Sequence, residues 1–267
     1  MFEFLKSAVL LGLRGRAVLS IVVLGFSLLG ASYVAADFSP RQPQAVALDV
    51  GLSFLRFSLV LLAISWIQDL VGKEFERKTV LFSFAYPTGR HAYIVGRYLG
   101  VLVLLAIATL VMGTFLAWVV SVSAHDYVQT QPIVLGTTFV VTLAGLYVDV
   151  AVVAAFALCI ASLSTVTLLP LALGGIFANV GRSLGPVMEY LRQGAEGDAQ
   201  LVANFSPALN VIQWLVPDLS RLDWRVWPMY QMPIPNEVMG WSVAMGLAYI
   251  GLMLALAVAA AGRRELT

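Results

Sequence analysis

The sequence has almost no cysteine, little histidine and few charged residues. Its single cysteine, Cys159, excludes a disulfide within the chain and any metal cluster held by several thiolates. Its two histidines, His91 and His125, fall on opposite sides of the membrane predicted below, so they cannot share one catalytic or metal site. Charged residues make up 12% of the chain, against roughly 25% in a typical soluble domain. A net charge of +1, without a basic run interleaved with aromatics, gives no indication of a nucleic-acid partner.

Hydrophobic residues instead dominate, at 60% of the chain with a mean hydropathy of +0.89. Such a chain cannot bury its apolar surface in one aqueous core, so a lipid bilayer must be part of its solvent. A transmembrane helix needs roughly 20 mostly apolar residues. We therefore predict one all-α transmembrane domain over 1–267, with about six spans at 17–36, 50–67, 98–120, 134–162, 166–180 and 238–261.

The distribution of Lys and Arg predicts the orientation of these spans. If the N-terminus is cytoplasmic, ten of the 16 Lys and Arg residues lie on the cytoplasmic side, five lie outside, and Arg56 lies within a span. Positive charge is concentrated in the cytoplasmic loops of membrane proteins. We therefore expect both termini to be cytoplasmic, in a multi-pass protein of the cell membrane, typically a bacterial inner membrane.

The first 16 residues have the pattern of a helix that lies along the inner membrane surface. Phe2, Phe4, Leu5 and Val9 fall largely on one helical face, while basic residues are placed to meet lipid headgroups. A secretory signal peptide is the alternative, because the first span ends in small residues at 34–36. A plain basic leader would not need the apolar face, so the interfacial helix is preferred.

The connection at 68–97 is the one densely charged internal segment, and we place it in the cytoplasm. It holds 30 residues, where a simple turn needs only a handful. Charges crowd its first third, an apolar strip follows at 80–86, and Pro87 and Gly89 break the pattern. This arrangement predicts a short amphipathic helix parallel to the membrane. The alternative is a solvated positive loop that only fixes topology, for which the apolar strip would be unnecessary.

The same segment resembles the first intracellular segment of ABC-2-type transporter permeases. The residues that carry the resemblance are Glu76-Arg77-Lys78-Thr79, Leu81, Pro87, Arg90, Gly96-Arg97 and Leu99-Gly100. This chain has Lys78 where the family commonly has Gly, and Arg97 where Lys is frequent. The predicted layout extends the resemblance over nearly the whole chain, with an interfacial helix, six spans, a long connection before the last span, and a basic C-terminal Gly262-Arg263-Arg264-Glu265-Leu266.

The resemblance implies an exporter subunit that pairs with a second copy or a related permease. Each permease would dock on a separate cytoplasmic ATPase, and that ATPase would bind ATP and Mg. The coupling residues it implies are Glu74, Glu76, Arg77, Lys78, Thr79, Leu81, Phe82, Phe84, Tyr86, Pro87 and Arg90. The sequence contains no phosphate-binding loop of its own and no hydrolase or metalloprotease motif, so we expect no catalytic site, metal or cofactor in this chain. A membrane scaffold that anchors a cytoplasmic protein without transport is the alternative.

Two charged residues fall inside predicted spans. Asp149 lies near the middle of the fourth span, where a carboxylate costs about 2.5–3.5 kcal/mol on insertion scales. It is either a pathway or interface group, or a hydrogen-bonded structural residue. Arg56 lies about two turns inside the second span, and we prefer a structural role in which it reaches outward to the headgroups over a pathway or interface role. We also consider an Arg56–Asp149 pair, although the predicted depths of the two residues differ by about 10 Å.

The external connection at 181–237 contains six prolines and several tryptophans. It predicts short external helices before the last span. These either gate an exit or contact an external partner, or they form an aromatic cap at the outer membrane surface. The sequence does not specify a substrate.

Overall fold

The structure is a computed structural model, and the part of the chain that it describes is helical. Among the described residues there is no β-strand, which confirms the all-α fold class. The described residues are 2–13, 15–39, 41–76, 90–123, 133, 135–164, 166, 168–193, 200, 211–212 and 216–263.

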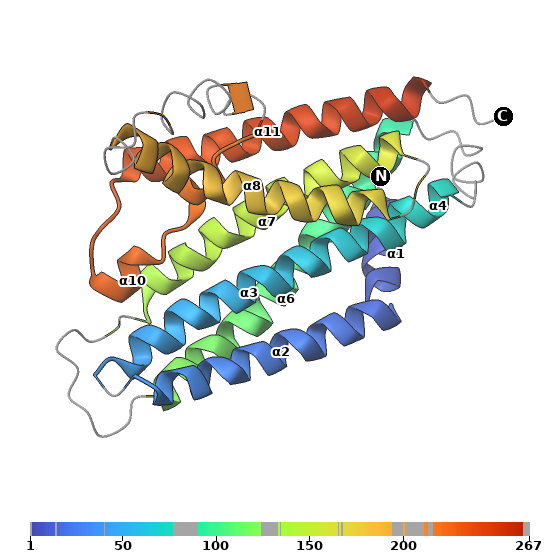
Figure 1. The fold of residues 1–267 in the computed structure, drawn as a ribbon. Coiled ribbons are helices and arrows are strands. Elements are labelled where there is room, and N and C mark those ends of the chain that lie inside the picture. The colour runs from blue at the N-terminus through green and yellow to red at the C-terminus, as the bar shows by residue number, and fades with distance from the viewer. Residues whose placement is uncertain are drawn as a thin grey trace.

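Five helices in the described part of the chain are long and apolar enough to cross a membrane. They lie side by side in a bundle (Figure 1). The chain is therefore a multi-pass helical membrane protein. These helices are α2 (Arg16–Asp37), α3 (Pro43–Ile67), α6 (Arg90–Val122), α7 (Thr137–Leu163) and α11 (Asn236–Arg263).

Helix α7 is the central helix of the bundle. In α7, 72% of the most apolar stretch is buried inside the protein, against 11% in α11, which leaves most of α11 facing outward. Helices α3, α6, α8 and α11 all pack against α7. Small buried side chains let neighbouring backbones approach α7 closely, as is usual between membrane helices. These residues are Ala151, Ala154, Ala155, Ala157 and Ala161.

The second predicted span is longer at both ends than 50–67. Helix α3 begins at Pro43, whose fixed φ suits the first turn of a helix. Beyond α3 the chain continues as a π-helix, η1 (Gln68–Gly72), and then as α4 (Lys73–Glu76). The first residues of the predicted cytoplasmic segment are thus a helical extension of the span.

The predicted N-terminal helix is present as α1 (Phe2–Gly12) and runs across one end of the bundle (Figure 1). It packs on α6, where the fully buried Ala8 meets the backbone at Gly100 and the Phe4 ring meets Tyr93 edge-on at 5.5 Å. The Trp66 indole of α3 donates a hydrogen bond to the Gly12 carbonyl at 3.1 Å. The helix is therefore tied to two spans, and its place at a membrane surface stays a prediction.

The helix at the fifth predicted span, 166–180, has different bounds from those predicted. Residues 169–192 form one helix, α8 (Leu169–Arg192). Helix α8 is not among the five helices that are both long enough and apolar enough to cross a membrane. The reason is its composition, because Arg182 and Glu189 interrupt the apolar run. The predicted external connection accordingly loses its first twelve residues, 181–192, to α8.

The bundle has two distinct ends (Figure 1). The start of α1, the end of α11 and helix α4 all lie at one end, which we call the α4 end. The short helix α10 (Val226–Tyr230) lies at the opposite end. The first helix, the end of the last helix and the described start of the 68–97 segment therefore lie at the same end of the bundle.

Residues 216–230 fold back against the bundle. They contain a 3-10 helix, η3 (Leu219–Leu222), and α10, which are the short helices predicted before the last span. Gly145 of α7 permits this close approach, because a Cβ there would meet the Leu222 carbonyl oxygen at 2.6 Å and the Trp224 ring at 2.8 Å. The segment consequently reaches the depth of the central turns of α7.

We predict that Gly145→Ala destabilises the protein by about 1–3 kcal/mol, because backbone and an indole ring must shift to admit the new methyl group. Gly251→Ala in α11 is the matched control, since its Cβ would meet nothing within 4 Å. Thermal unfolding of the two purified variants in one detergent is the measurement. Equal midpoints for the two variants would contradict the close packing of 216–230 on α7.

Candidate functional site

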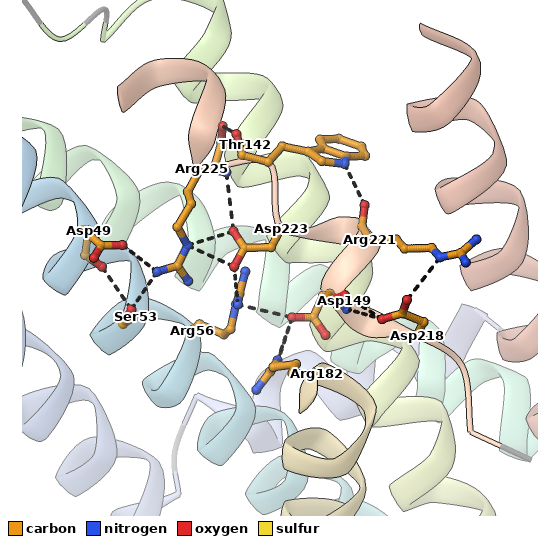
Figure 2. Close-up of polar contacts among 12 residues, drawn as sticks. Asp49, Ser53, Arg56, Thr142, Asp149, Arg182, Asp218, Arg221, Asp223 and Arg225 are labelled. Carbon is orange, nitrogen blue, oxygen red and sulfur yellow. Dashed lines mark hydrogen bonds and ion pairs between the residues drawn. The ribbon is translucent and has the colours of Figure 1, made fainter. Parts of the chain in front are cut away.

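A network of charged side chains, buried at its centre and partly exposed at its edge, lies between α3, α7, α8 and the 216–230 segment (Figure 2). Its centre is Asp149, the thirteenth residue of α7, whose side chain is 0% exposed. Arg182 of α8 donates two hydrogen bonds to Asp149 Oδ2, from Nη2 at 2.9 Å and from Nε at 3.1 Å. Asp149 therefore faces protein, and not the apolar surface of the bundle.

The hypothesis of an Arg56–Asp149 pair is confirmed. Arg56 Nε lies 3.4 Å from Asp149 Oδ2, and the Arg56 side chain is only 11% exposed. The depth mismatch disappears because α3 begins at Pro43, seven residues before the predicted start, and seven residues add about 10 Å of helix. The preferred prediction that Arg56 reaches outward to the headgroups is wrong.

Asp223 and Arg225 extend this network to a second layer of contacts. Arg56 Nη1 donates to Asp223 Oδ2 at 2.8 Å, and Arg225 Nε donates to both Asp223 oxygens at 2.9 Å. Arg225 Nη1 then donates to Asp49 at 2.7 Å and to Ser53 at 2.9 Å, both on α3. Arginine and aspartate thus alternate, with three of each sign, from α8 to the start of α3 (Figure 2).

No sequence pattern marks Asp223 or Arg225 as part of a site. Both lie in a Pro- and Trp-rich connection, where a charged residue is ordinary, and only the path of the chain brings them to the depth of Arg56. The predicted end of the fifth span at Val180 places Arg182 outside the membrane. In the structure Arg182 instead lies within α8 and pairs with Asp149. Asp149 and Arg56 are the two residues of this site that the sequence marks, since each interrupts an apolar run.

Local hydrogen bonds fix the shape of the 218–225 loop that supplies Asp223. The Asp218 carboxylate accepts bonds from the Ser220 amide at 3.1 Å and the Ser220 hydroxyl at 2.6 Å, which caps η3. The Trp224 indole donates to the Arg221 carbonyl at 2.9 Å. The Thr142 hydroxyl of α7 donates to the Trp224 carbonyl at 3.1 Å, which anchors the loop to the central helix (Figure 2).

Some hydrogen-bonding capacity within the network is unused. Within the described part of the chain, Arg56 Nε and Asp149 Oδ1 are buried without a hydrogen-bond partner.

Two network residues outside the five spans, Asp223 and Arg225, have shifted pKa values. Burial disfavours ionisation of Asp223, but the charge of Arg56 and hydrogen bonds from Arg225 outweigh it and hold the pKa of Asp223 below its usual range. Burial likewise opposes the Arg225 cation, but Asp223 and Asp49 raise its pKa.

A second cluster lies at the α4 end and includes part of the predicted coupling segment. Glu74 of α4 forms an ion pair with Arg97 of α6, whose side chain is only 5% exposed. The Tyr93 hydroxyl also donates to Glu74, and the Arg97 guanidinium lies 5.5 Å from the centre of the Tyr93 ring. Arg97 Nη1 donates to the Ser7 hydroxyl of α1 at 3.3 Å. We call these four residues the α4 clamp.

The α4 clamp joins the two flanks of the predicted coupling segment. The other predicted coupling residues cannot be placed in it: Glu76 ends α4 and Arg90 begins α6, but their side chains are not described. The remaining predicted coupling residues lie outside the described residues, namely Arg77, Lys78, Thr79, Leu81, Phe82, Phe84, Tyr86 and Pro87.

Comparison with models of known protein families finds no match, and comparison with curated proteins finds none either. The resemblance to ABC-2-type permeases therefore depends on the motif residues and the layout of the chain.

We predict that Asp149→Asn destabilises the protein by about 3–5 kcal/mol, because it leaves Arg56 and Arg182 without their buried counter-charge. The free energy of unfolding of the purified protein in bicelles is the measurement. Asp37→Asn, an exposed carboxylate at the end of α2, is the control and should change little. The double variant Asp149→Asn/Arg182→Gln should lose less than the sum of the two single variants, and strict additivity would contradict the pairing.

We also predict that the contribution of Asp223 to stability depends on pH. Its folded pKa is lowered, so this contribution is complete above the unfolded value of about 3.9 and is lost as the pH falls through the folded pKa. The difference in unfolding free energy between the native chain and Asp223→Asn should therefore be constant near pH 7 and shrink below about pH 4. A difference that did not change over that range would contradict a charged, paired Asp223.

Proposed function

We propose that this chain is the membrane-spanning subunit of an ATP-driven exporter of the ABC-2 type. In this proposal a separate cytoplasmic ATPase binds ATP and Mg, and a second copy or a related permease completes the membrane part. The residues that resemble the family at 76–100, the several long apolar helices and the transverse α1 support the proposal. The α4 clamp is the observation that carries it.

The α4 clamp matters because it ties both flanks of the 77–89 segment to each other and to α1. A docking segment can transmit force only if its two ends are firmly attached to the helices that must move. Glu74 and Arg97 provide that attachment through a charge-assisted contact in a mostly buried position. A push from an ATPase on 77–89 would then displace α1, the α3–α4 helix and α6 together.

Helix α3 connects the α4 clamp to the charged network. Glu74 belongs to the helical extension of α3, and Arg56 lies 18 residues earlier, at about 27 Å along the same helix. The π-helical turn at Gln68–Gly72 lies between them, and such turns recur at functional positions in helices. A movement of α3 along its axis would shift Arg56 against Asp149 and Asp223, so the network is placed to respond to events at the α4 end.

We predict that purification of the tagged chain from its native membrane recovers a phosphate-loop ATPase. We also predict that Glu74→Gln lowers ATP-dependent transport or conformational change by about fivefold or more. The ATPase should remain bound to this variant. Glu237→Gln is the matched control, because Glu237 is exposed in the first turn of α11, at the other end of that helix from the α4 end. Thermal midpoints of the two variants should be compared first, to exclude loss of the fold.

Recovery of no ATPase, together with no ATP-dependent change after reconstitution, would contradict the proposal. A stable cytoplasmic partner without ATPase activity would instead support the non-transporting scaffold.

A further inference from the structure

A cavity of about 390 Å³ lies between α3 and α8, next to the charged network. This volume is within the range of ligand pockets, about 300–1,000 Å³. Phe57, which lines the cavity, is 51% exposed, so the cavity opens at the surface of the bundle.

The cavity is polar at one end and apolar at the other. Three arginines, Arg56, Arg182 and Arg225, line the first end together with Ser53 and Asn179. The second end lies about two turns further along α3, because eight residues separate Arg56 from Ile64, or about 12 Å. Apolar side chains of both helices line it, namely Val60, Leu61, Ile64 and Leu171.

The charges that face the cavity have one sign. No aspartate or glutamate is among its described lining residues, whereas three guanidinium groups are. The arginines form ion pairs with Asp223, Asp149 and Asp49, and none of these three aspartates lines the cavity. The arginines are thereby fixed in place, and their charge is presented to the cavity.

The arginines also retain free donor capacity. Each guanidinium has five N–H donors. Among the described residues, no hydrogen bond is made by Nη2 of Arg56, Nη1 of Arg182 or Nη2 of Arg225. Guanidinium groups bind carboxylate and phosphate oxygens in a paired geometry and suit partly buried sites better than lysine does.

We propose that this cavity binds an amphiphilic anion, with its phosphate or carboxylate head at the three arginines and its hydrocarbon chain along the apolar end towards Ile64 and Leu171. The two ends of the cavity match the two parts of such a molecule. A small inorganic anion would leave the apolar end empty, and a neutral hydrocarbon would leave the guanidinium donors unused. Binding does not depend on an ATPase, so this proposal is independent of the transport function.

An anion at the head site would change the balance of the network. Arg56, Arg182 and Arg225 match three aspartates, so an anion bound at the unused donors leaves the site with an excess of negative charge.

The test compares dodecyl phosphate, dodecyl phosphocholine and inorganic phosphate as probes for the full-length purified chain in a neutral detergent. Only dodecyl phosphate should raise the thermal midpoint in a concentration-dependent manner, because a ligand that binds the native state stabilises it. Equal stabilisation by dodecyl phosphocholine, which has the same chain and no net charge, would overturn the proposal. So would full stabilisation by inorganic phosphate alone.

Gly175→Leu is the decisive variant, because Gly175 lines the cavity and a Cβ there meets nothing within 4 Å. The leucine should fill the apolar end without touching the arginines, and should weaken dodecyl phosphate binding about tenfold or more, which corresponds to about 1.4 kcal/mol. Gly251→Leu is the matched control on α11, where an added Cβ also meets nothing within 4 Å. Unchanged binding by Gly175→Leu would overturn the proposal.

Mass spectrometry of lipids that copurify with the two variants identifies the source of the ligand. An anionic phospholipid retained by Gly251→Leu and lost by Gly175→Leu would identify a resident membrane lipid. Dodecyl phosphate binding without any retained lipid would support the site and exclude a tightly held membrane lipid as its natural ligand.

Discussion

The burial of Asp149 is the constraint on which the arrangement of this bundle depends. Contacts between apolar side chains set the relative heights of membrane helices only weakly, because lipid tails are as apolar as the helices themselves. A carboxylate in the middle of the central helix must instead find counter-charges at its own depth. Arg56 and Arg182 meet that requirement and so fix the heights of α3 and α8 against α7. Asp223, which also pairs with Arg56, draws the 216–225 segment into the bundle.

The sequence predicted the long helices well and the charged network only in part. Apolar runs of sufficient length can have few other structures in a bilayer, so hydropathy located the spans to within several residues. The predicted start of α3 is too late because Gln44 and Asp49 lower the hydropathy of its first turns. That error placed Arg56 too close to the membrane surface. Asp223 and Arg225 were beyond reach, because their depth depends on the path of the whole connection and not on their neighbours in sequence.

The α4 clamp shows the same limit at the other end of the bundle. In the sequence, Arg97 serves as a marker of orientation and as a motif position beside the third span. In the structure it is buried beneath α1, with partners that come from three separate segments of the chain. Burial of this kind results from tertiary packing, which local residue patterns do not report. The α4 clamp and the charged network nevertheless share one continuous helical segment, from α3 through η1 to α4.

The equal number of arginines and aspartates in the network has a consequence for a protein in an energised membrane. A charge that crosses the full membrane potential exchanges about 2.3 kcal/mol per 100 mV with the field. Three positive and three negative groups that move together gain or lose almost no energy in the field. Movement of the intact network is therefore insensitive to the membrane potential. If one arginine moves along the membrane normal away from its aspartate, the voltage acts on that displacement. Any step that opens the network would thereby draw on, or work against, the membrane potential.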